Sequence, residues 1–334
     1  MGRRSANGVR AIIAVLLVLA AACSSDDGSD RSDGSDADPA PSAETTEPVR
    51  VVTFNLLHGL FCPPDTDWCQ APDRVQIFTE LVEDAGCPDL VGLQEIGERL
   101  EQVLPAALGA VCDGTYEVAW QPVESPDREM VLSRLPIVDR GYLDIANFPW
   151  EAYWVRVTHP DQGDVDFLTA HFASSGNNPP CAPDRCPPAC PVGMITNECH
   201  AHEVVDFLAE RPEGAALTIA SGDFNASPTS ATVATLLEAG FVDTWLEAGN
   251  PECDPTSHAG CTGGGAQPEP FVGMDTPEGP GYDERIDYVM VRPGPDCDLD
   301  VAAEPFAGEP RAEALNGLWW PADHAGVLAE LRCD

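Results

Sequence analysis

The chain has 334 residues, of which 56 are acidic and 17 basic, giving a formal net charge of −39. All of its basic residues are arginines, because the sequence contains no lysine. Binding to nucleic acid without sequence preference depends on Lys and Arg side chains that contact phosphates. This composition therefore excludes a histone-like or repressor-like protein, and it is typical of a protein that stays soluble in a salty exterior.

The first 22 residues have the pattern of a bacterial secretion signal. The segment MGRRSANGVR carries three arginines and no acid, and the apolar run that follows ends at Cys23. This run is too short for a comfortable transmembrane span. Small residues ahead of a cysteine resemble a lipoprotein signal, in which the cysteine is acylated and becomes the new N-terminus. We expect loss of residues 1–22 and an extracytoplasmic protein, either lipid-anchored to the cell membrane at Cys23 or cleaved and secreted.

The segment behind Cys23 has almost nothing apolar to bury. Ser, Asp, Gly, Pro, Glu and Thr dominate it, and such a composition cannot offset the entropy lost on ordering a chain. Residues 23–48 are therefore predicted to form a disordered acidic tether. Residues 49–334 contain no repeat and no second low-complexity break, so we expect one domain and a monomer.

The elements of this domain are predicted from the spacing of its apolar residues. Buried strands are expected over residues 49–55, 89–95, 116–120, 130–133, 153–157, 165–172, 217–223 and 286–291. Helices are expected over residues 73–86, 97–108, 200–210 and 229–239, the last begun by Ser227 as N-cap and Pro228 in the first turn. Because residues 116–172 hold strands without helices, two packed sheets with helices on their outer faces fit better than one doubly wound sheet.

The cysteines indicate a disulfide framework. Of the 13 cysteines, all but Cys23 lie in the domain, and an even number in an oxidising compartment favours disulfides. Proximity in sequence predicts four pairs, Cys62–Cys69, Cys87–Cys112, Cys253–Cys261 and Cys297–Cys333. Three pairings are open for a further cluster, and a zinc site is the alternative interpretation of it: Cys181, Cys186, Cys190 and Cys199.

Polar side chains stand at or near the ends of the predicted strands. Asp223 and Asn225 are two residues apart in SGDFN, so they face the same way beyond a strand end. The other runs place polar groups similarly, at Asn55, Glu95, His171, Asp287 and the pair Asp323-His324. Six runs that each deliver such groups predict a shared site rather than chance loop composition.

Each of these residues alone has a structural alternative. Asp223 and Asn225 would serve as turn formers, and His171 as a satisfied core imidazole. Asp323 would serve as the N-cap of a last short element. Other histidines lie in or beside predicted loops and are interpreted as surface residues: His58, His200, His202 and His258.

The order of the motifs resembles that of a known superfamily. Asn closes VVTFN, Gln-Glu closes VGLQE, His lies in LTAHF, and GDFN, RIDY and a final DH follow. This set is similar to the signature of the endonuclease/exonuclease/phosphatase superfamily, which includes pancreatic-type deoxyribonuclease, abasic-site endonucleases, bacterial sphingomyelinases and inositol-polyphosphate phosphatases. The resemblance spans Val51 to Leu331. It implies an α/β four-layer α-β-β-α sandwich, two central mixed β-sheets flanked by helices, with residues 49–334 as the catalytic domain.

The resemblance also implies a metal-assisted reaction. A divalent cation would be bound by Glu95, Asn55 and Asp323, and these oxygen ligands suit Mg²⁺, with Mn²⁺ or Ca²⁺ as substitutes. His324 would be the general base that takes a proton from the attacking water. Asp287 would orient this imidazole and stabilise its charge.

Four further residues receive roles from the same resemblance. Asp223 would help to position the water, while Asn225 and His171 would hydrogen-bond phosphoryl oxygens. Glu129, in DREMVLS, falls where deoxyribonuclease-like members keep a glutamate paired with the second histidine. The reaction implied is hydrolysis of a phosphate ester.

The substrate class stays open between nucleic acid, a phospholipid and a small phosphodiester. A secreted nuclease would need cations along a backbone track, for which the candidates are Arg74, Arg128, Arg156 and Arg185. A membrane-proximal phosphodiesterase would use the lipid anchor and the aromatic residues in 148–154 and 317–320, although core packing is the alternative for Tyr153 and Trp154. The non-catalytic alternative is a disulfide-stapled surface protein that keeps the fold for binding.

Overall fold

The computed structural model describes residues 46–57, 70–97, 100–120, 128–146, 151–182, 186–187, 189–263 and 273–334. The predicted signal segment, Cys23, most of the tether and the Cys62–Cys69 pair lie outside these ranges. Within them, none of the helices has the length and apolar character needed to cross a membrane.

One six-stranded sheet has the order β11-β12-β1-β2-β4-β3. Its central strand β1 pairs in parallel with β2 and antiparallel with β12. The strands are β1 Val49–Asn55, β2 Leu90–Gln94, β3 Glu117–Trp120, β4 Met130–Ser133, β11 Leu299–Phe306 and β12 Gly326–Cys333.

The second sheet also has six strands, in the order β5-β6-β7-β8-β10-β9. Here β8 pairs in parallel with β7 and antiparallel with β10. Each sheet is therefore mixed, and each has its parallel pair at the centre. The strands are β5 Ile137–Asp144, β6 Glu151–His159, β7 Gly163–His171, β8 Leu217–Asp223, β9 Val242–Asp243 and β10 Asp287–Pro293.

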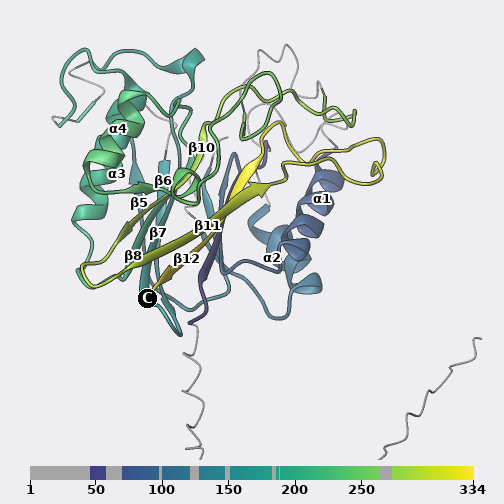
Figure 1. The fold of residues 1–334 in the computed structure, drawn as a ribbon, viewed down its shortest axis with the longest axis horizontal. Coiled ribbons are helices and arrows are strands. Elements are labelled where there is room, and N and C mark those ends of the chain that lie inside the picture. The colour runs from purple at the N-terminus through teal and green to yellow at the C-terminus, as the bar shows by residue number, and fades with distance from the viewer. Residues whose placement is uncertain are drawn as a thin grey trace, which may run out of the picture. The chain divides into compact units, whose positions relative to one another are not determined.

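The two sheets pack face to face, and helices cover their outer faces (Figure 1). Helices α1, Ala71–Asp84, and α2, Leu100–Val111, pack on the first sheet. Helices α3, Thr196–Ala209, and α4, Ala231–Glu238, pack on the second. The short helices α5, Thr244–Glu247, and η2, Ser175–Asn177, lie in connections. The predicted four-layer α/β sandwich is confirmed.

Three apolar clusters correspond to the three interfaces between these layers. The middle cluster joins inward residues of both sheets, such as Val51, Phe167, Ile219 and Val289, each at most 1% exposed. Central strands are covered on both faces, which is why they appear in the sequence as continuous apolar runs rather than as alternating ones. The fully buried β1 residues Val51 and Val52 illustrate this, because they pack into different clusters.

The eight predicted strands are confirmed, three of them with identical bounds, and four strands were missed. β5 and β11 are edge strands with alternating exposure, and charged or proline residues interrupt their apolar pattern. β9 has only two residues. β12 is well buried, but its sequence GVLAELRC is rich in residues that favour helices.

The predicted start of α4 was wrong. Its N-cap is Ser230, whose side chain accepts a hydrogen bond from the backbone N–H of Val233 at 3.2 Å. The backbone carbonyl of Ser227 instead accepts from the Ser230 N–H at 2.9 Å. Ser227 and Pro228 therefore form the turn that leads into the helix.

Five disulfides hold the described part of the chain. The predicted pairs Cys87–Cys112, Cys253–Cys261 and Cys297–Cys333 are confirmed. The open cluster resolves into Cys181–Cys186 and Cys190–Cys199. All four of its sulfur atoms are thus used in disulfides, which leaves no thiolate for the alternative zinc site.

His200 is a core residue, and its interpretation as a surface histidine was wrong. It is fully buried in α3, with Nδ1 accepting from the Ala173 N–H at 3.3 Å and Nε2 2.7 Å from the Ala146 carbonyl oxygen. A neutral imidazole with its proton on Nε2 satisfies both contacts. Burial lowers the pKa of His200 from 6.5 to about 4. His202 is half-buried and His258 is exposed, whereas His58 lies outside the described residues.

We expect His200 to make the fold sensitive to acid. Protons bind the unfolded chain more readily than the folded one between pH 6.5 and 4, so its contribution is complete above pH 6.5 and is lost as pH falls. The loss amounts to about 3 kcal/mol. The free energy of unfolding, measured by denaturant titration across this pH range, should change less with pH for His200→Gln than for the wild type. His202→Gln, on the same helix, is the control, and an equal slope in wild type and His200→Gln would contradict the assignment.

Candidate active site

The predicted polar residues meet at one edge of the sandwich. His171 and Asp223 end the parallel strands β7 and β8 opposite each other, and Asp287 begins β10 opposite Asp223. In the other sheet Asn55 ends β1, while β12 runs the opposite way and begins just after His324. Because neighbouring strands such as β8 and β10 run in opposite directions, the C-terminal end of one and the N-terminal start of the other lie at the same edge. The residues there can therefore form one shared site.

Asp223 lies at the centre of this group. Its Oδ2 accepts a hydrogen bond from Asn55 Nδ2 at 3.1 Å and lies 3.4 Å from His171 Nε2 and 3.7 Å from His324 Nε2. Its Oδ1 accepts from the Asn225 backbone N–H at 2.9 Å. Asp223 is 1% exposed, so these contacts replace its hydration.

His324 and Asp287 form the second part of the site. Nδ1 of His324 lies 3.0 Å from Oδ2 of Asp287, and the aspartate is fully buried. With the Nδ1 proton on this bond, Nε2 faces Asp223, and in the neutral ring it is the nitrogen that can accept a proton. The His324 side chain is 13% exposed, which leaves the ring accessible from the site.

Asn55 links two carboxylates. Its Nδ2 donates to Glu95 Oε1 at 3.0 Å as well as to Asp223, and its Oδ1 accepts from the Leu57 N–H at 3.0 Å. Glu95 has a left-handed backbone, with φ of 56°, and Asn225 does too, with φ of 46°. Such conformations cost energy in non-glycine residues and persist where the surrounding structure enforces them.

Asn225 and His171 also adjoin Asp223. Nδ2 of Asn225 lies 3.0 Å from His171 Nε2 and donates to the Phe172 carbonyl at 3.0 Å. Glu129 directly precedes β4, whose first residue pairs with Leu93 of β2, and it is 3% exposed. It therefore lies at the same edge of the first sheet as Glu95, and its pairing with a histidine stays a prediction.

The site carries excess negative charge. Burial raises the pKa of Asp287 to about 6, with the Asp223 charge adding to this and His324 opposing it. Burial also raises the pKa of Asp323. Burial lowers the pKa of His324, but the nearby carboxylates of Asp287, Asp223 and Asp323 outweigh it and raise the pKa well above its usual value. A cation bound here would relieve this repulsion among carboxylates.

The residues present fit a divalent cation. Asp223, Asp287 and His324 offer ligand atoms that all lie within 4.8 Å of one another. Asp323 Oδ1 is buried and has no hydrogen-bond partner among the described residues. Carboxylate oxygens are the donors that Mg²⁺, Mn²⁺ and Ca²⁺ prefer. Direct binding by the predicted set of Glu95, Asn55 and Asp323 stays a prediction, and in the structure Asn55 holds two carboxylates together.

Arg74, which sequence analysis placed on a substrate track, lies under the site instead. Its fully buried guanidinium donates to the carbonyls of Leu56 and Leu57, each at 2.6 Å, and of Pro321 at 3.0 Å. It therefore ties the chain after Asn55 to the chain before Asp323. Burial lowers its pKa to about 10, against the charges of Asp323 and Glu95, so it stays cationic at neutral pH.

Sequence reasoning also missed residues whose role depends on distant contacts. Gly222 has φ of 143°, and a Cβ there would lie 1.8 Å from the Ala170 carbonyl oxygen. A Cβ at Gly263 would lie 3.1 Å from His324 Cε1. Thr262 Oγ1 accepts from the N–H groups of Ile286 and Asp287. The position of Gly222 just before Asp223 was the only signal available for these contacts.

A family model matches most of the chain. The model of the endonuclease/exonuclease/phosphatase family matches residues 52–324. No curated protein matches the sequence.

Several solved structures are similar in fold. TDP2 of D. rerio, complexed with single strand DNA product, shares 17% identity at a TM-score of 0.59, covering 85% of this chain and 98% of that one. An endonuclease/exonuclease/phosphatase of Bacteroides vulgatus shares 18% identity at a TM-score of 0.56, covering 86% of this chain and 99% of that one. The mannosyl-6-phosphatase of Bacteroides thetaiotaomicron shares 16% identity at a TM-score of 0.57, covering 85% of this chain and 99% of that one. At these identities the similarity shows the fold alone.

Gly222→Ala should destabilise the site edge strongly. The added Cβ would overlap the Ala170 carbonyl, so β7 and β8 would have to separate beside Asp223. We expect the free energy of unfolding to fall by about 3 kcal/mol or more. Gly214→Ala is the matched control, because Gly214 also has positive φ but open space around its Cβ position, and about 1 kcal/mol is expected there. Equal losses in the two variants would contradict the steric argument.

Arg74→Met should leave buried carbonyls without donors. We expect the free energy of unfolding to fall by about 3 kcal/mol or more in denaturant titrations. Arg74→Lys should recover only part of this, since one ammonium group cannot span carbonyls from two segments. Arg134→Met is the control, because Arg134 also donates to two carbonyls at 2.8 Å but is exposed, and a loss under about 1 kcal/mol is expected. A similar loss for both methionine variants would show that burial is not decisive.

Proposed function

The chain belongs to the endonuclease/exonuclease/phosphatase family, and from this premise we propose that it is a divalent-metal-dependent phosphodiesterase that acts outside the cytoplasm. The observation that carries the proposal is the convergence of His324, Asp287 and Asp223, whose side-chain nitrogen and oxygen atoms lie within 4.8 Å of one another at the site edge. A binding protein has no need of a histidine held by one buried carboxylate and facing a second. The extracytoplasmic location rests on the signal pattern and on the disulfides.

His324 acts as the general base in this proposal. Its Nδ1 is engaged by Asp287, so in the neutral ring Nε2 takes the proton from a water molecule that contacts both the imidazole and Asp223. A bound cation would favour this neutral form, because it offsets the carboxylate charges that raise the pKa of His324. Asp287 holds the ring orientation and stabilises the imidazolium that forms. Asp223 accepts a hydrogen bond from the same water and directs its lone pair toward phosphorus.

The phosphate is held by two side chains that adjoin Asp223. Asn225 Nδ2 and His171 Nε2 lie 3.0 Å apart, and each would donate a hydrogen bond to a phosphoryl oxygen in place of the contact between them. The carboxylates of Glu95 and Asp323 would hold the cation, and Asn55 fixes the orientation of Glu95 by a hydrogen bond. When bound, the divalent cation withdraws electron density from a phosphoryl oxygen and offsets the charge that develops in the transition state.

Nucleic acid loses support as the substrate. Two arginines predicted for its backbone track are buried: Arg74 binds carbonyls, and Arg156 pairs with Asp166 at 2.7 Å. Arg128 lies with its guanidinium 5.6 Å from the centre of the Trp120 ring, and Arg185 is outside the described residues. Of the candidate cations that the structure describes, Arg74 and Arg156 are therefore engaged within the protein and not presented to a polyanion.

An embedded phospholipid loses support as well. Tyr153 and Trp154 are buried, as the core-packing alternative predicted, and Trp320 is buried against Tyr282. Trp319 is half-buried, so the aromatic belt expected at a lipid interface is not formed by these described residues. The described residues Tyr153, Trp154 and Trp320 thus contribute to the core.

A cavity near the site favours a small ester with an uncharged or cationic group. It has a volume of about 430 Å³ and is lined by Tyr282, among others, but by none of the residues assigned to the site. Burial raises the pKa of Tyr282, and this side chain is close enough to the site for the charges of Asp323 and Asp287 to raise that pKa further. Glu278 and Glu309 also line it, and none of its described lining residues is a lysine or arginine. Carboxylates repel additional phosphates and attract amines or hydroxyl groups. We therefore include a small phosphodiester with such a leaving group among the proposed substrates.

The proposal is tested by hydrolysis assays on the full chain with Mg²⁺ or Mn²⁺. The panel is bis-p-nitrophenyl phosphate, glycerophosphocholine, plasmid DNA, RNA and sphingomyelin vesicles. We expect turnover of a small diester, and a kcat lower by about 100- to 10,000-fold in His324→Ala, because general-base catalysis contributes that range. Chelation by EDTA should abolish turnover in the wild type.

His202→Ala serves as the matched control, because His202 lies on α3 and is not part of the His324–Asp287 pair. This substitution should leave kcat unchanged. Turnover that survives both EDTA and His324→Ala would overturn the mechanism. Faster hydrolysis of plasmid DNA than of every small diester would instead identify nucleic acid as the substrate class. Silence of the wild type on the whole panel, with no Mn²⁺ bound in calorimetry, would favour the non-catalytic alternative.

A further inference from the structure

The hydroxyl group of Thr262 supports the His324–Asp287 pair through the backbone at Asp287. Thr262 is 3% exposed, and its Oγ1 accepts hydrogen bonds from the backbone N–H groups of Ile286 and Asp287, each at 3.0 Å. Asp287 is the first residue of β10, and Ile286 directly precedes it. A single side chain outside both central sheets thus fixes the backbone that carries the orienting carboxylate.

The backbone of the same residue is fixed to the other member of the pair. The Thr262 carbonyl accepts from the Ala325 N–H at 2.7 Å, directly after His324, and its own N–H donates to the Glu284 carbonyl at 2.9 Å. Gly263 follows, and its missing side chain lets the loop lie against the His324 ring, since a Cβ would come within 3.1 Å of Cε1. Thr262 is therefore connected to the strand start of Asp287 and to the segment of His324.

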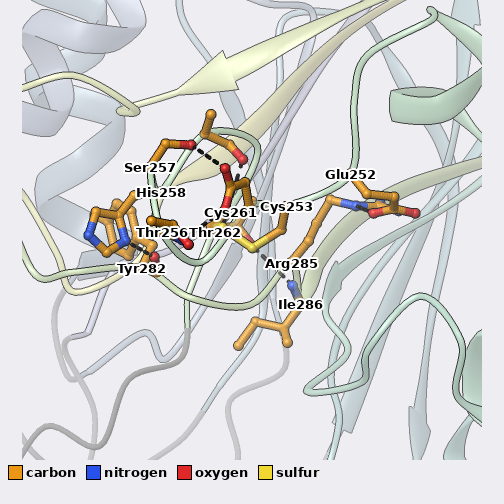
Figure 2. The surroundings of a disulfide bond; sticks show 12 residues. Glu252, Cys253, Thr256, Ser257, His258, Cys261, Thr262, Tyr282, Arg285 and Ile286 are labelled. Carbon is orange, nitrogen blue, oxygen red and sulfur yellow. Dashed lines mark hydrogen bonds and ion pairs between the residues drawn. A yellow bond between two sulfur atoms is a disulfide. The ribbon is translucent and has the colours of Figure 1, made fainter.

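A disulfide closes the loop that presents Thr262. Cys261, the preceding residue, is bonded to Cys253 (Figure 2). Next to Cys253, Glu252 binds the buried Arg285 through both carboxylate oxygens at 3.0 Å. Arg285 in turn lies two residues from Asp287 and also binds Asp243 at 2.8 Å. Both ends of the closed loop are thus anchored beside the start of β10.

We propose that Thr262 is a positioning residue for the His324–Asp287 pair, and that the Cys253–Cys261 disulfide keeps it in register. The inference rests on the proposed function, because it assumes that this pair is the catalytic base. It deepens that function by naming the group that sets the angle between carboxylate and imidazole. Loss of the hydroxyl would let Asp287 shift on its strand, and the His324 Nε2 lone pair would turn away from the water.

The first test compares three variants of the full chain on the best substrate of the panel. Thr262→Val keeps the shape but removes the hydroxyl, and Thr262→Ser keeps the hydroxyl. We expect kcat to fall about 10- to 100-fold in the valine variant, as is typical when a group supporting a catalytic ligand is removed. KM should change less than about twofold, and the serine variant should stay within about threefold of wild type. Thr79→Val, a buried threonine whose hydroxyl bonds a helix carbonyl, is the control and should retain wild-type kcat.

A second measurement does not depend on turnover. The proton on the His324–Asp287 hydrogen bond should give a downfield imidazole resonance in proton NMR, assigned by its absence from His324→Ala. We expect Thr262→Ser to keep this resonance, and Thr262→Val to shift or broaden it while the aliphatic spectrum stays folded. Should the wild type fail to hydrolyse the whole panel, the proposed function fails while this signal still tests the positioning role.

The disulfide is tested by Cys253→Ser/Cys261→Ser, with Cys87→Ser/Cys112→Ser as the control for losing a bond on the far side of the first sheet. We expect kcat to fall less in Cys253→Ser/Cys261→Ser than in Thr262→Val, because Glu252 still binds Arg285. The control variant should keep its kcat at temperatures below its own unfolding transition. A valine variant with wild-type kcat and an unchanged resonance overturns the proposal. Equal losses in the serine and valine variants overturn it too, because the hydroxyl would then not matter.

Discussion

The structure depends on one buried carboxylate that receives its partners from both sheets. Asp223 ends a strand of the second sheet, accepts a hydrogen bond from Asn55 of the first, and lies within 3.7 Å of His324. A buried charge is costly unless it is hydrogen-bonded on several sides, so the sheets must pack at the separation and angle that keep these contacts. The sandwich core and the site are therefore linked, since a change in sheet packing would leave Asp223 without its partners.

Much of this arrangement could be predicted from the sequence, because the central strands are local and strongly apolar. β1, β4 and β8 were placed with their observed bounds, and the polar residues at strand ends were recognised before their partners were known. Alternation of strand direction then brings those ends to one edge. The edge strands β5 and β11 were missed because only one face of each is covered, which weakens the apolar signal.

The rest could not be predicted because it depends on contacts between distant segments. An arginine in a helix gives no local sign that it will serve buried carbonyls more than 200 residues away, as Arg74 does with Pro321. His200 was interpreted as exposed because its helix begins earlier than expected and faces the second sheet. Thr262 lies in a glycine-rich loop, and only the position of Ile286 and Asp287 turns its hydroxyl into a structural support.

The direction of β1 has a consequence for how the protein meets its surroundings. β1 begins at Val49 and reaches the site at Asn55, about 20 Å further along the strand. β12 runs the opposite way and pairs Leu331 with Val49, so the C-terminal end of the chain leaves at the same edge as the N-terminal entry (Figure 1). Both described ends of the domain thus lie at the edge opposite the candidate site, so a fusion at either end would begin away from the site.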